Sequence, residues 1–338
     1  MRFEATSAPP EGWDAGLAAV GGTVFHCLRW ARYRRATSAA TPLFCSWFSD
    51  SDPRPAAFAL GFERALSLPG RAGRLLRRLE FDSAPLGTGE GDLLAPLLAW
   101  CRSQRTLLDL RLGSFDARRS WGNVPLPHPA ARIEFLAAPA AREQLLRRMR
   151  EDKRRAVKRA EHAGLEVREG GRGDVDAFVD LYDQTIARLS GAKGVALETL
   201  DREAVAELVE SGSGRLFLVW EGPDPVAACL FGTFGRSAFY LHNGAGARAF
   251  ETGAVPLLIL ESLERLGAEG FDRLNLGGVG AAAVDPADRD HGLYIFKSSL
   301  GTAQSACEGG TVVLRPRLLS ALSVARRVAV PRGRSAGR

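Results

Sequence analysis

Long apolar stretches, paired cysteines and a secretory leader are all missing from this sequence of 338 residues. No apolar run comes near the ~18 residues that a membrane-spanning helix needs. The five cysteines lie far apart and form no Cys-x-x-Cys motif, which favours reduced thiols over a disulfide framework. The first residues carry acids and prolines where a signal peptide needs a basic and then an apolar stretch. These absences predict a cytoplasmic protein.

Several catalytic motifs are missing as well. The five histidines have neither HxH nor HxxxH spacing, so no metal site is predicted. No GxxxxGK[ST], no GxSxG and no GxGxxG after a strand occurs, which leaves nucleotide hydrolysis and serine hydrolase chemistry without support. We therefore expect no permanently bound cofactor.

Basic residues are present in excess, but they are concentrated in two segments. The net charge is +6, whereas residues 147–159 alone hold eight Lys and Arg against two acids. Residues 315–338 hold seven arginines and no acid, so the rest of the chain is acidic. Concentrated positive charge attracts phosphates, RNA or an anionic membrane surface. Within the first segment, Arg154, Arg155 and Lys158 are the predicted phosphate-binding residues.

The distribution of apolar residues predicts an α/β protein. In the first 140 residues we expect helices within 11–35 and at 93–102, and strands at 42–48, 55–62, 106–113 and 131–136. The second half is clearer, with helices predicted at 141–163, 174–189, 199–210 and 254–270. Strands at 215–220, 226–234 and 238–244 are joined by tight turns and predict an antiparallel meander. A glycine-rich loop (244–253) and a strand at 271–278 complete the pattern.

This order of elements is that of the acyltransferase fold called GNAT, and several segments together resemble the FemABX family of GNAT-like proteins. The most specific segments are VPLLILESLERLGAEGFDRLNLGGVG (255–280) and HGLYIFKSSLG (291–301), supported by MREDKRRAVKRAEHAGLEV (149–167). The resemblance implies two tandem GNAT-like domains with mainly antiparallel sheets flanked by helices. We place the first at 1–140 and the catalytic one at 141–314, followed by a flexible basic tail at 315–338.

The resemblance also implies the reaction, which is acyl transfer to an amine. The expected donor is aminoacyl-tRNA or acyl-CoA, and the expected acceptor is an amine-bearing precursor of cell-envelope peptidoglycan or polysaccharide. Members that use tRNA often carry an inserted helical hairpin, whereas residues 141–163 read as one helix. The chain therefore resembles the shorter branch of the family, and the tRNA donor is the less secure of the two.

Lys297 is the first candidate catalytic residue, because the resemblance places the matching lysine at the reaction centre. A lysine ammonium in a cleft that excludes water stabilises the oxyanion that forms during aminolysis. Its apolar neighbours, Phe296 among them, are expected to hold its stem and to contribute to substrate binding. Tyr240 and His242 alternate on one predicted strand and are expected on one face, with His242 handling a proton and Tyr240 binding substrate.

Two further residues are candidates for substrate binding. Arg188, in a T-x-x-R context, resembles the substrate-binding arginine of the family and suits a carboxylate or a phosphate. Asn275 stands where many relatives carry an acid, which argues against a general base at that position. Two alternatives stay open: an acyl-CoA-dependent acetyltransferase acting on a sugar or small amine, and a non-catalytic module that binds RNA or a membrane surface.

Overall fold

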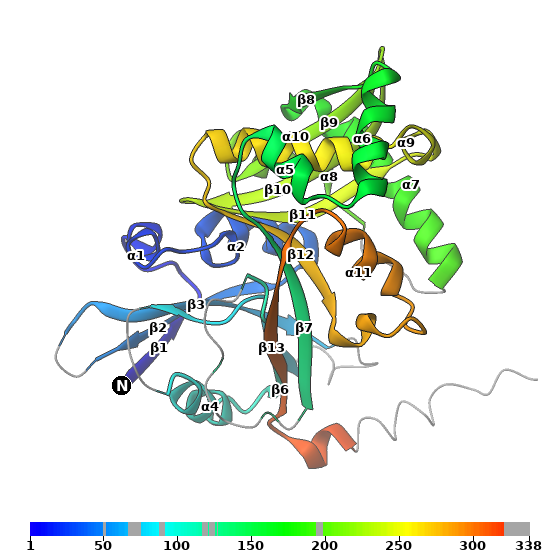
Figure 1. The fold of residues 1–338 in the computed structure, drawn as a ribbon. Helices are drawn as coiled ribbons and strands as arrows, with labels where there is room; N and C mark the ends of the chain where they lie inside the picture. The colour runs from blue at the N-terminus through cyan, green and yellow to red at the C-terminus, as the bar shows by residue number, and fades with distance from the viewer. Residues whose placement is uncertain are drawn as a thin grey trace, which may run out of the picture.

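The computed structural model describes residues 1–49, 52–66, 76–87, 92–116, 121, 126, 128–193 and 199–320. Most of the predicted tail at 315–338 therefore lies outside the described residues. The fold is mixed α/β and contains one 13-stranded, mostly antiparallel sheet flanked by helices (Figure 1). Its strand order is β1-β2-β3-β4-β6-β13-β7-β12-β11-β10-β9-β8, and β5 pairs with β3. The predicted fold class is confirmed.

The first half of the chain contributes the strands at one end of this sheet. Its elements are β1 (Arg2–Thr6), α1 (Trp13–Ala19), α2 (Leu28–Ser38), β2 (Thr41–Phe48), β3 (Pro55–Ala65), β4 (Arg77–Phe81), β5 (Leu86–Gly87), α4 (Leu94–Ser103), β6 (Leu107–Leu112) and β7 (His128–Ala137). Helix α4 crosses over between the parallel strands β4 and β6. Strands β1, β4 and β5 are additions to the predicted list.

The second half repeats this order at the other end of the sheet. Its elements are α5 (Arg142–Arg148), α6 (Glu151–His162), β8 (Glu166–Gly170), α7 (Val175–Lys193), α8 (Arg202–Glu210), β9 (Gly214–Glu221), β10 (Asp224–Phe234), β11 (Ser237–Ala245), α9 (Ala247–Thr252), α10 (Ala254–Ala268), β12 (Arg273–Gly280), α11 (His291–Ser298) and β13 (Ala303–Val313). The predicted β9–β10–β11 meander is confirmed. The predicted glycine-rich loop contains the short helix α9.

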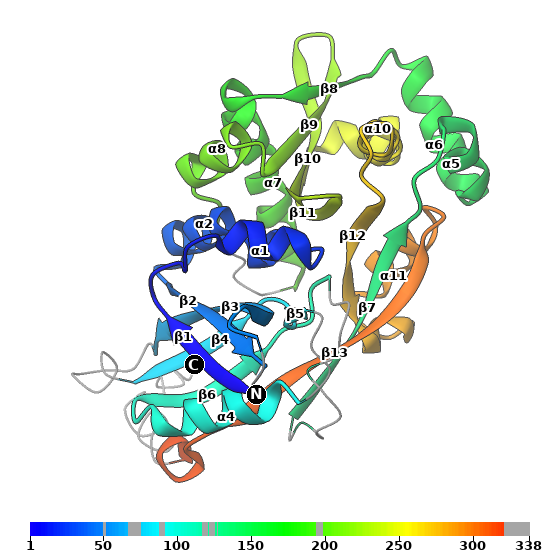
Figure 2. The same cartoon turned by 90° about the vertical axis from the view of Figure 1, so that its left-hand side faces the viewer.

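The two halves are joined by an exchange of their last strands. Strand β7 ends the first half in sequence, yet it pairs with β12 of the second half. Strand β13 comes last and pairs with β6 of the first half as well as with β7. Figure 2 shows these two long strands running side by side between the two groups of elements. Residues far apart in sequence are therefore held together at the centre of the molecule.

Apolar side chains form buried clusters on both faces of the sheet. Helices α5, α6 and α10 cover one face of the second half, where Met149, Val157 and Leu257 are buried. Helices α7 and α8 cover the other face, and α2 of the first half packs against α8 in the same cluster. This shared cluster fixes the two halves against each other. None of the described helices is long and apolar enough to cross a membrane.

The prediction of one continuous helix at 141–163 is wrong, because this segment forms two helices. It is interrupted at Met149 and Arg150, whose backbones are extended. The amide of Arg150 donates a hydrogen bond to the carbonyl of Ser299 at 2.9 Å, and Met149 is buried in the core. The backbone bond to a residue distant in sequence and the burial of Met149 offset the cost of breaking the helix. The result is two short helices, α5 and α6, at an angle to each other (Figure 2).

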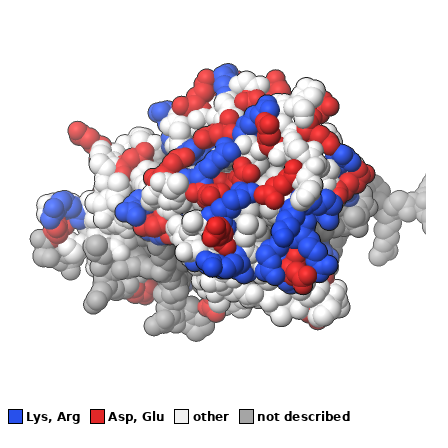
Figure 3. Space-filling view, turned by 45° about the horizontal axis from the view of Figure 1, so that its top comes forward, with Lys and Arg blue, Asp and Glu red and all other residues white. Residues whose placement is uncertain are grey.

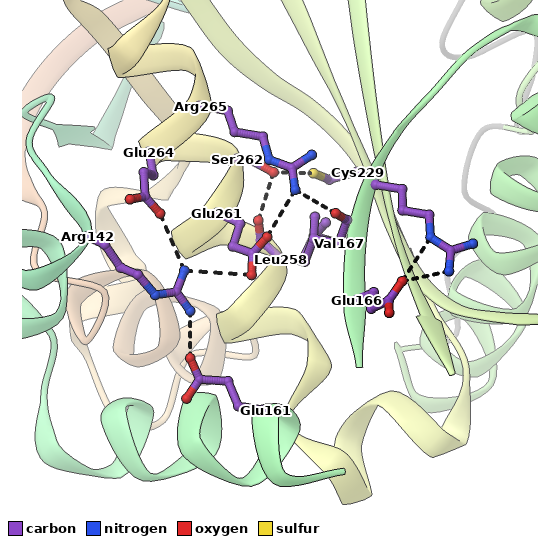
Figure 4. A network of polar contacts seen from close by, with 11 residues as sticks. Arg142, Glu161, Glu166, Val167, Cys229, Leu258, Glu261, Ser262, Glu264 and Arg265 are labelled. Atoms are coloured by element: carbon purple, nitrogen blue, oxygen red, sulfur yellow. Dashed lines mark hydrogen bonds and ion pairs between the residues drawn. The ribbon is translucent and has the colours of Figure 1, made fainter. Parts of the chain in front are cut away.

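Ion pairs between the helices fasten α5 and α6 to α10. The guanidinium of Arg142 lies 2.6 Å from Glu161, 3.6 Å from Glu261 and 3.4 Å from Glu264 (Figure 4). Since these acids lie on α6 and α10, one side chain of α5 joins three helices. Burial raises the pKa of Glu261, so this carboxylate depends on its basic neighbours to stay ionised.

Replacing Arg142 by alanine is expected to lower the free energy of unfolding by about 1 kcal/mol, because three carboxylates then lose their shared partner. Arg168→Ala is the matched control, since Arg168 pairs with the exposed Glu166 and is expected to cost well under about 0.5 kcal/mol. Urea unfolding of both variants measures the difference. Equal costs for the two variants would contradict a role of this network in stability.

Candidate active site

A cavity of about 880 Å³ lies where strands β11 and β12 part from each other. The two strands are parallel and pair only from Ser237 and Arg273 as far as Phe239 and Asn275. The residues that follow on each strand, beginning with Tyr240 on β11 and the glycines of β12, line the cavity. Parted strands leave backbone N–H and C=O groups free to bind a ligand. The size is ordinary for a substrate pocket.

The cavity wall carries a strong excess of positive charge. Among the residues that the structure describes, its basic ones are Arg34, Arg132, Lys153, Arg159, Arg188, Arg289 and Lys297, and its one carboxylate is that of Asp82. Between them lie aromatic side chains from both halves, including Phe25, Phe115 and Phe239. A cationic wall with apolar surfaces fits a ligand that bears phosphate or carboxylate groups together with an uncharged part.

Lys297 reaches the cavity from helix α11. It lies in the last turn of this helix. The side chain is 9% exposed, and its Nζ donates a hydrogen bond to the carbonyl of Leu276 at 2.6 Å. Burial lowers the pKa of Lys297 to about 7, with repulsion from Arg132 acting in the same direction and attraction from Glu134 opposing it. The amine therefore titrates near neutral pH.

A β-bulge changes the predicted arrangement of Tyr240 and His242. In the register of β10 and β11, Leu230 pairs with His242 and Phe231 with Tyr240, so Leu241 is an extra residue. The alternation that would place both side chains on one face is broken. Tyr240 packs against Phe231, with its ring 5.9 Å from the Nζ of Lys297. Both residues still line the same cavity.

His242 lies on the side of helices α2 and α7. Its Nε2 is 3.1 Å from the hydroxyl of Tyr33, and its ring meets Tyr182 edge to face. Burial lowers the pKa of His242 to about 4, so its imidazole is neutral at pH 7. Burial also raises the pKa of Tyr240 well above its ordinary value, which keeps the phenol protonated. The neutral imidazole can accept a hydrogen bond, and the phenol can donate one.

Arg188 and Phe296 also line the cavity. The guanidinium of Arg188 lies 4.5 Å from the ring centre of Phe250, which is itself 53% exposed. Such a contact holds an arginine in place without neutralising it. The Nζ of Lys153 lies 5.4 Å from the ring centre of Phe296. Together with Arg132 beside Phe115 and Lys297 beside Tyr240, these contacts place an aromatic ring next to a cation at four points on the described wall.

The basic segment contributes residues other than the predicted ones. Arg154 donates to the carbonyl of Met149, Arg155 pairs with Glu151 at 2.9 Å, and Lys158 is exposed. These three do not belong to the cavity wall, whereas Lys153 and Arg159 of the same helix do. The sequence did contain a signal for this choice. Ala156, Val157 and Ala160 form the buried face of α6, and basic residues beside that face point inward.

The outer surface carries no comparable excess of one charge where Figure 3 shows it. Basic and acidic side chains are interspersed over most of this face, although a compact group of basic residues stands at one side. Of the eight basic residues at 147–159, only Lys153 and Arg159 line the cavity.

Asn275 is buried beside the cavity and is absent from its wall. Its amide nitrogen donates to Asp116 at 3.1 Å and to Glu134 at 2.7 Å. Neither carboxylate was predicted, because neither lies in a recognisable motif. They come from the first half of the chain and meet Asn275 only through the exchange of β7.

Residues 147–290 match the family described as "Acetyltransferase (GNAT) domain". This part of the chain, a little under half of its length, is similar to a GNAT domain. The match supports acyltransferase activity, as the sequence predicted. No curated protein matches the chain.

Solved structures agree with the GNAT domain on the fold. The crystal structure of FemX is 13% identical and has a TM-score of 0.66, covering 94% of this chain and 99% of that one. A conserved protein of unknown function from Bacteroides thetaiotaomicron VPI-5482 is 12% identical with a TM-score of 0.60, covering 91% and 98%. The likeness to FemX confirms a FemABX-like fold around the GNAT domain.

Proposed function

We propose that this acyltransferase forms an amide, by moving an acyl group from a phosphate-bearing carrier to an amine in the cavity between β11 and β12. The observation that carries the proposal is the buried Nζ of Lys297, which faces the cavity and titrates near neutral pH. We assign Lys297 the stabilisation of the oxyanion. The remaining protons of its ammonium are available to the substrate while one is held by Leu276.

In the proposed reaction the nitrogen of a neutral amine attacks the carbonyl carbon of an ester or thioester. A C–N bond forms while the carbonyl electron pair moves onto oxygen, which faces the Lys297 ammonium. The intermediate then collapses: the oxyanion pair re-forms the carbonyl, the C–O or C–S bond to the carrier breaks, and the carrier leaves with the two electrons of that bond. The amine proton passes to solvent or to the imidazole of His242. Tyr240 and Arg188 place the acceptor, and Phe296 packs beside the reacting groups.

The charge of the cavity supports a donor with phosphate groups, and we propose acyl-CoA or aminoacyl-tRNA. Lys153 and Arg159 line the cavity and are suited to those phosphates. We propose an acceptor amine on a precursor of cell-envelope peptidoglycan or polysaccharide, modified in the cytoplasm. Residues 141–314 would be the catalytic domain and residues 1–140 a second GNAT-like domain. Contact with an anionic membrane surface through the basic tail belongs to the same proposal.

An acyl-CoA donor acting on a sugar or small amine is the second candidate, and the match to a GNAT acetyltransferase domain favours it. The two donors are separated by adding coenzyme A or charged tRNA and measuring thermal unfolding. Saturable stabilisation by coenzyme A alone supports the second candidate. Amide formation from charged tRNA, detected by mass spectrometry, supports the first. Absence of transfer from either donor to any amine in an envelope-precursor extract would contradict the proposed function.

Arg188→Ala is expected to raise KM for the anionic substrate about tenfold and to change kcat by less than about threefold, because the arginine binds without touching the reacting atoms. Arg172→Ala is the matched control, since that arginine is exposed and paired with Glu203 and Glu210. Steady-state kinetics of both variants measure the effect. A loss of kcat in Arg188→Ala at unchanged KM would contradict a binding role.

A further inference from the structure

We propose that Asn275 is a positioning residue, which holds the Lys297 ammonium in the cavity through the backbone turn at Leu276 and Gly277 and is itself fixed by Asp116 and Glu134. This inference rests on the proposed function of Lys297. It assigns a role to three buried polar residues that do not line the cavity.

Asn275 uses both ends of its side-chain amide. The Nδ2 group donates to Oδ1 of Asp116 at 3.1 Å and to Oε2 of Glu134 at 2.7 Å. The Oδ1 atom accepts the backbone N–H of Gly277 at 2.8 Å. An amide can donate to two carboxylates and accept from a backbone N–H at once, whereas an ionised carboxylate only accepts. This combination explains an asparagine at a position where an acid would repel its neighbours.

The backbone turn held by Asn275 is the one that binds Lys297. Gly277 has a φ of +69°, and the pairing of β12 with β7 is irregular between Asn275 and Gly278. At this irregularity the carbonyl of Leu276 faces Nζ of Lys297 at 2.6 Å. A Cβ on Gly277 would lie 3.2 Å from the same Nζ, so the backbone approaches the amine closely. Fixing the amide of Gly277 therefore fixes the peptide whose carbonyl holds the amine.

The two carboxylates are themselves held by several donors. The backbone amide of Asp116 donates to both oxygens of Glu134, at 3.1 and 3.0 Å. Ser237 donates to Asp116 at 3.1 Å. Asp116 follows β6 and Glu134 lies on β7, whereas Ser237 and Asn275 belong to β11 and β12. The first half of the chain thus fixes a turn of the second half.

Asn275 also supports the ammonium form of Lys297 through the charge of Glu134. The groups that face Lys297 are Arg132 and Glu134 from β7 and the Tyr240 ring from β11. Burial raises the pKa of Glu134, whereas its hydrogen bond from Asn275 lowers that pKa. Asn275 therefore helps to keep Glu134 ionised, and ionised Glu134 offsets the repulsion between Arg132 and Lys297.

The test is competitive labelling of the whole protein with acetic anhydride from pH 5 to 10, read by mass spectrometry. The chain has only four lysines, so Lys297 is followed individually, with the exposed Lys158 as internal reference. Asn275→Leu changes no charge but removes every contact of the amide. We expect the neutral fraction of Lys297 at pH 6 to rise at least about threefold, because its ammonium loses a fixed acceptor. Ser262→Ala, a buried polar control outside the network, is expected to leave it unchanged.

A second pair of variants guards against misfolding of Asn275→Leu. Glu134→Gln removes the nearby anion and is expected to raise the neutral fraction of Lys297 in the same way. Adding Asn275→Asp to Glu134→Gln restores the net charge and the contact between positions 275 and 134, but it removes the donor to Asp116. We expect the neutral fraction of Lys297 in this double variant to lie between that of Glu134→Gln and that of the unmodified protein.

Titration of Lys297 unchanged in folded Asn275→Leu, or no recovery in the folded double variant, would overturn the inference. Labelling reports on Lys297 whether or not it takes part in acyl transfer. If Lys297→Ala kept full activity while the labelling results held, the proposed catalytic role of Lys297 would fail and the positioning role of Asn275 would stand.

Discussion

Lys297→Ala is expected to lower kcat for amide formation by between about 10² and about 10³, because one charged contact to the oxyanion is lost. The ammonium acts on charge that develops only in the transition state, so KM for either substrate is expected to change little. Lys297→Met gives a sharper test, since methionine keeps most of the apolar stem beside Phe296 and removes only the charge. Its kcat is expected to fall as far as that of the alanine variant.

The folded state is not expected to suffer from this change. The pKa of Lys297 is lowered to about 7 because burial destabilises its charged form in the folded protein. Removing the charge is therefore expected to cost little stability at neutral pH. We expect the free energy of unfolding of Lys297→Met to lie within about 1 kcal/mol of the unmodified protein. The exposed Lys158→Ala is the kinetic control and is expected to keep full activity. Turnover by Lys297→Met at the unmodified rate would refute oxyanion stabilisation by Lys297.

The pH dependence of kcat is expected to follow the charge of Lys297. The pKa of Lys297 is lowered to about 7, so its ammonium is present below that value and is lost as pH rises through it. Above pH 7 we therefore expect kcat to fall about tenfold for each unit of pH. On the acid side, His242 has its pKa lowered to about 4 and is neutral until that value is reached. Activity is expected to be highest between these two values.

The acceptor amine also titrates, and a matched variant removes its influence. Lys297→Arg keeps a positive charge at all relevant pH values. The ratio of the unmodified kcat to that of Lys297→Arg, measured from pH 5 to 9 with saturating substrates, cancels the ionisation of the acceptor. We expect this ratio to fall above pH 7. A ratio that rises through pH 7 would instead show that Lys297 works as a neutral base.

The fold could be predicted in those segments where residues close together in sequence determine the local structure. The β9–β10–β11 meander has alternating apolar residues and tight turns, and both signals are local. The break between α5 and α6 could not be predicted, because it depends on a hydrogen bond from Arg150 to Ser299. The exchange of β7 and β13 could not be predicted either, because the sequence of a strand does not determine which strand it pairs with.

The structure brings together five of the residues that the sequence analysis singled out. Lys297, Tyr240, His242, Arg188 and Phe296 all line one cavity, and their roles stay predictions. The prediction that Tyr240 and His242 share a face is wrong. The β-bulge at Leu241 adds one residue, which breaks the alternation of side chains between the two faces of the strand.

The sequence analysis missed the residues that reach the site only through tertiary contacts. Arg132 and Glu134 lie on β7, in a sequence with no motif, and reach Lys297 only because β7 pairs with β12. Lys153 was passed over in favour of its basic neighbours, although the side of α6 that is buried could have singled it out.

The placement of β13 has a consequence for synthesis of the chain. On the ribosome, β6 can pair with β4 early, but its other neighbour emerges only after residue 303. Until then the nascent first half presents an open edge of backbone donors and acceptors, which is the kind of edge that recruits foreign strands. Truncations that end before β13 are expected to leave this edge permanently uncovered and to aggregate, whatever their remaining sequence.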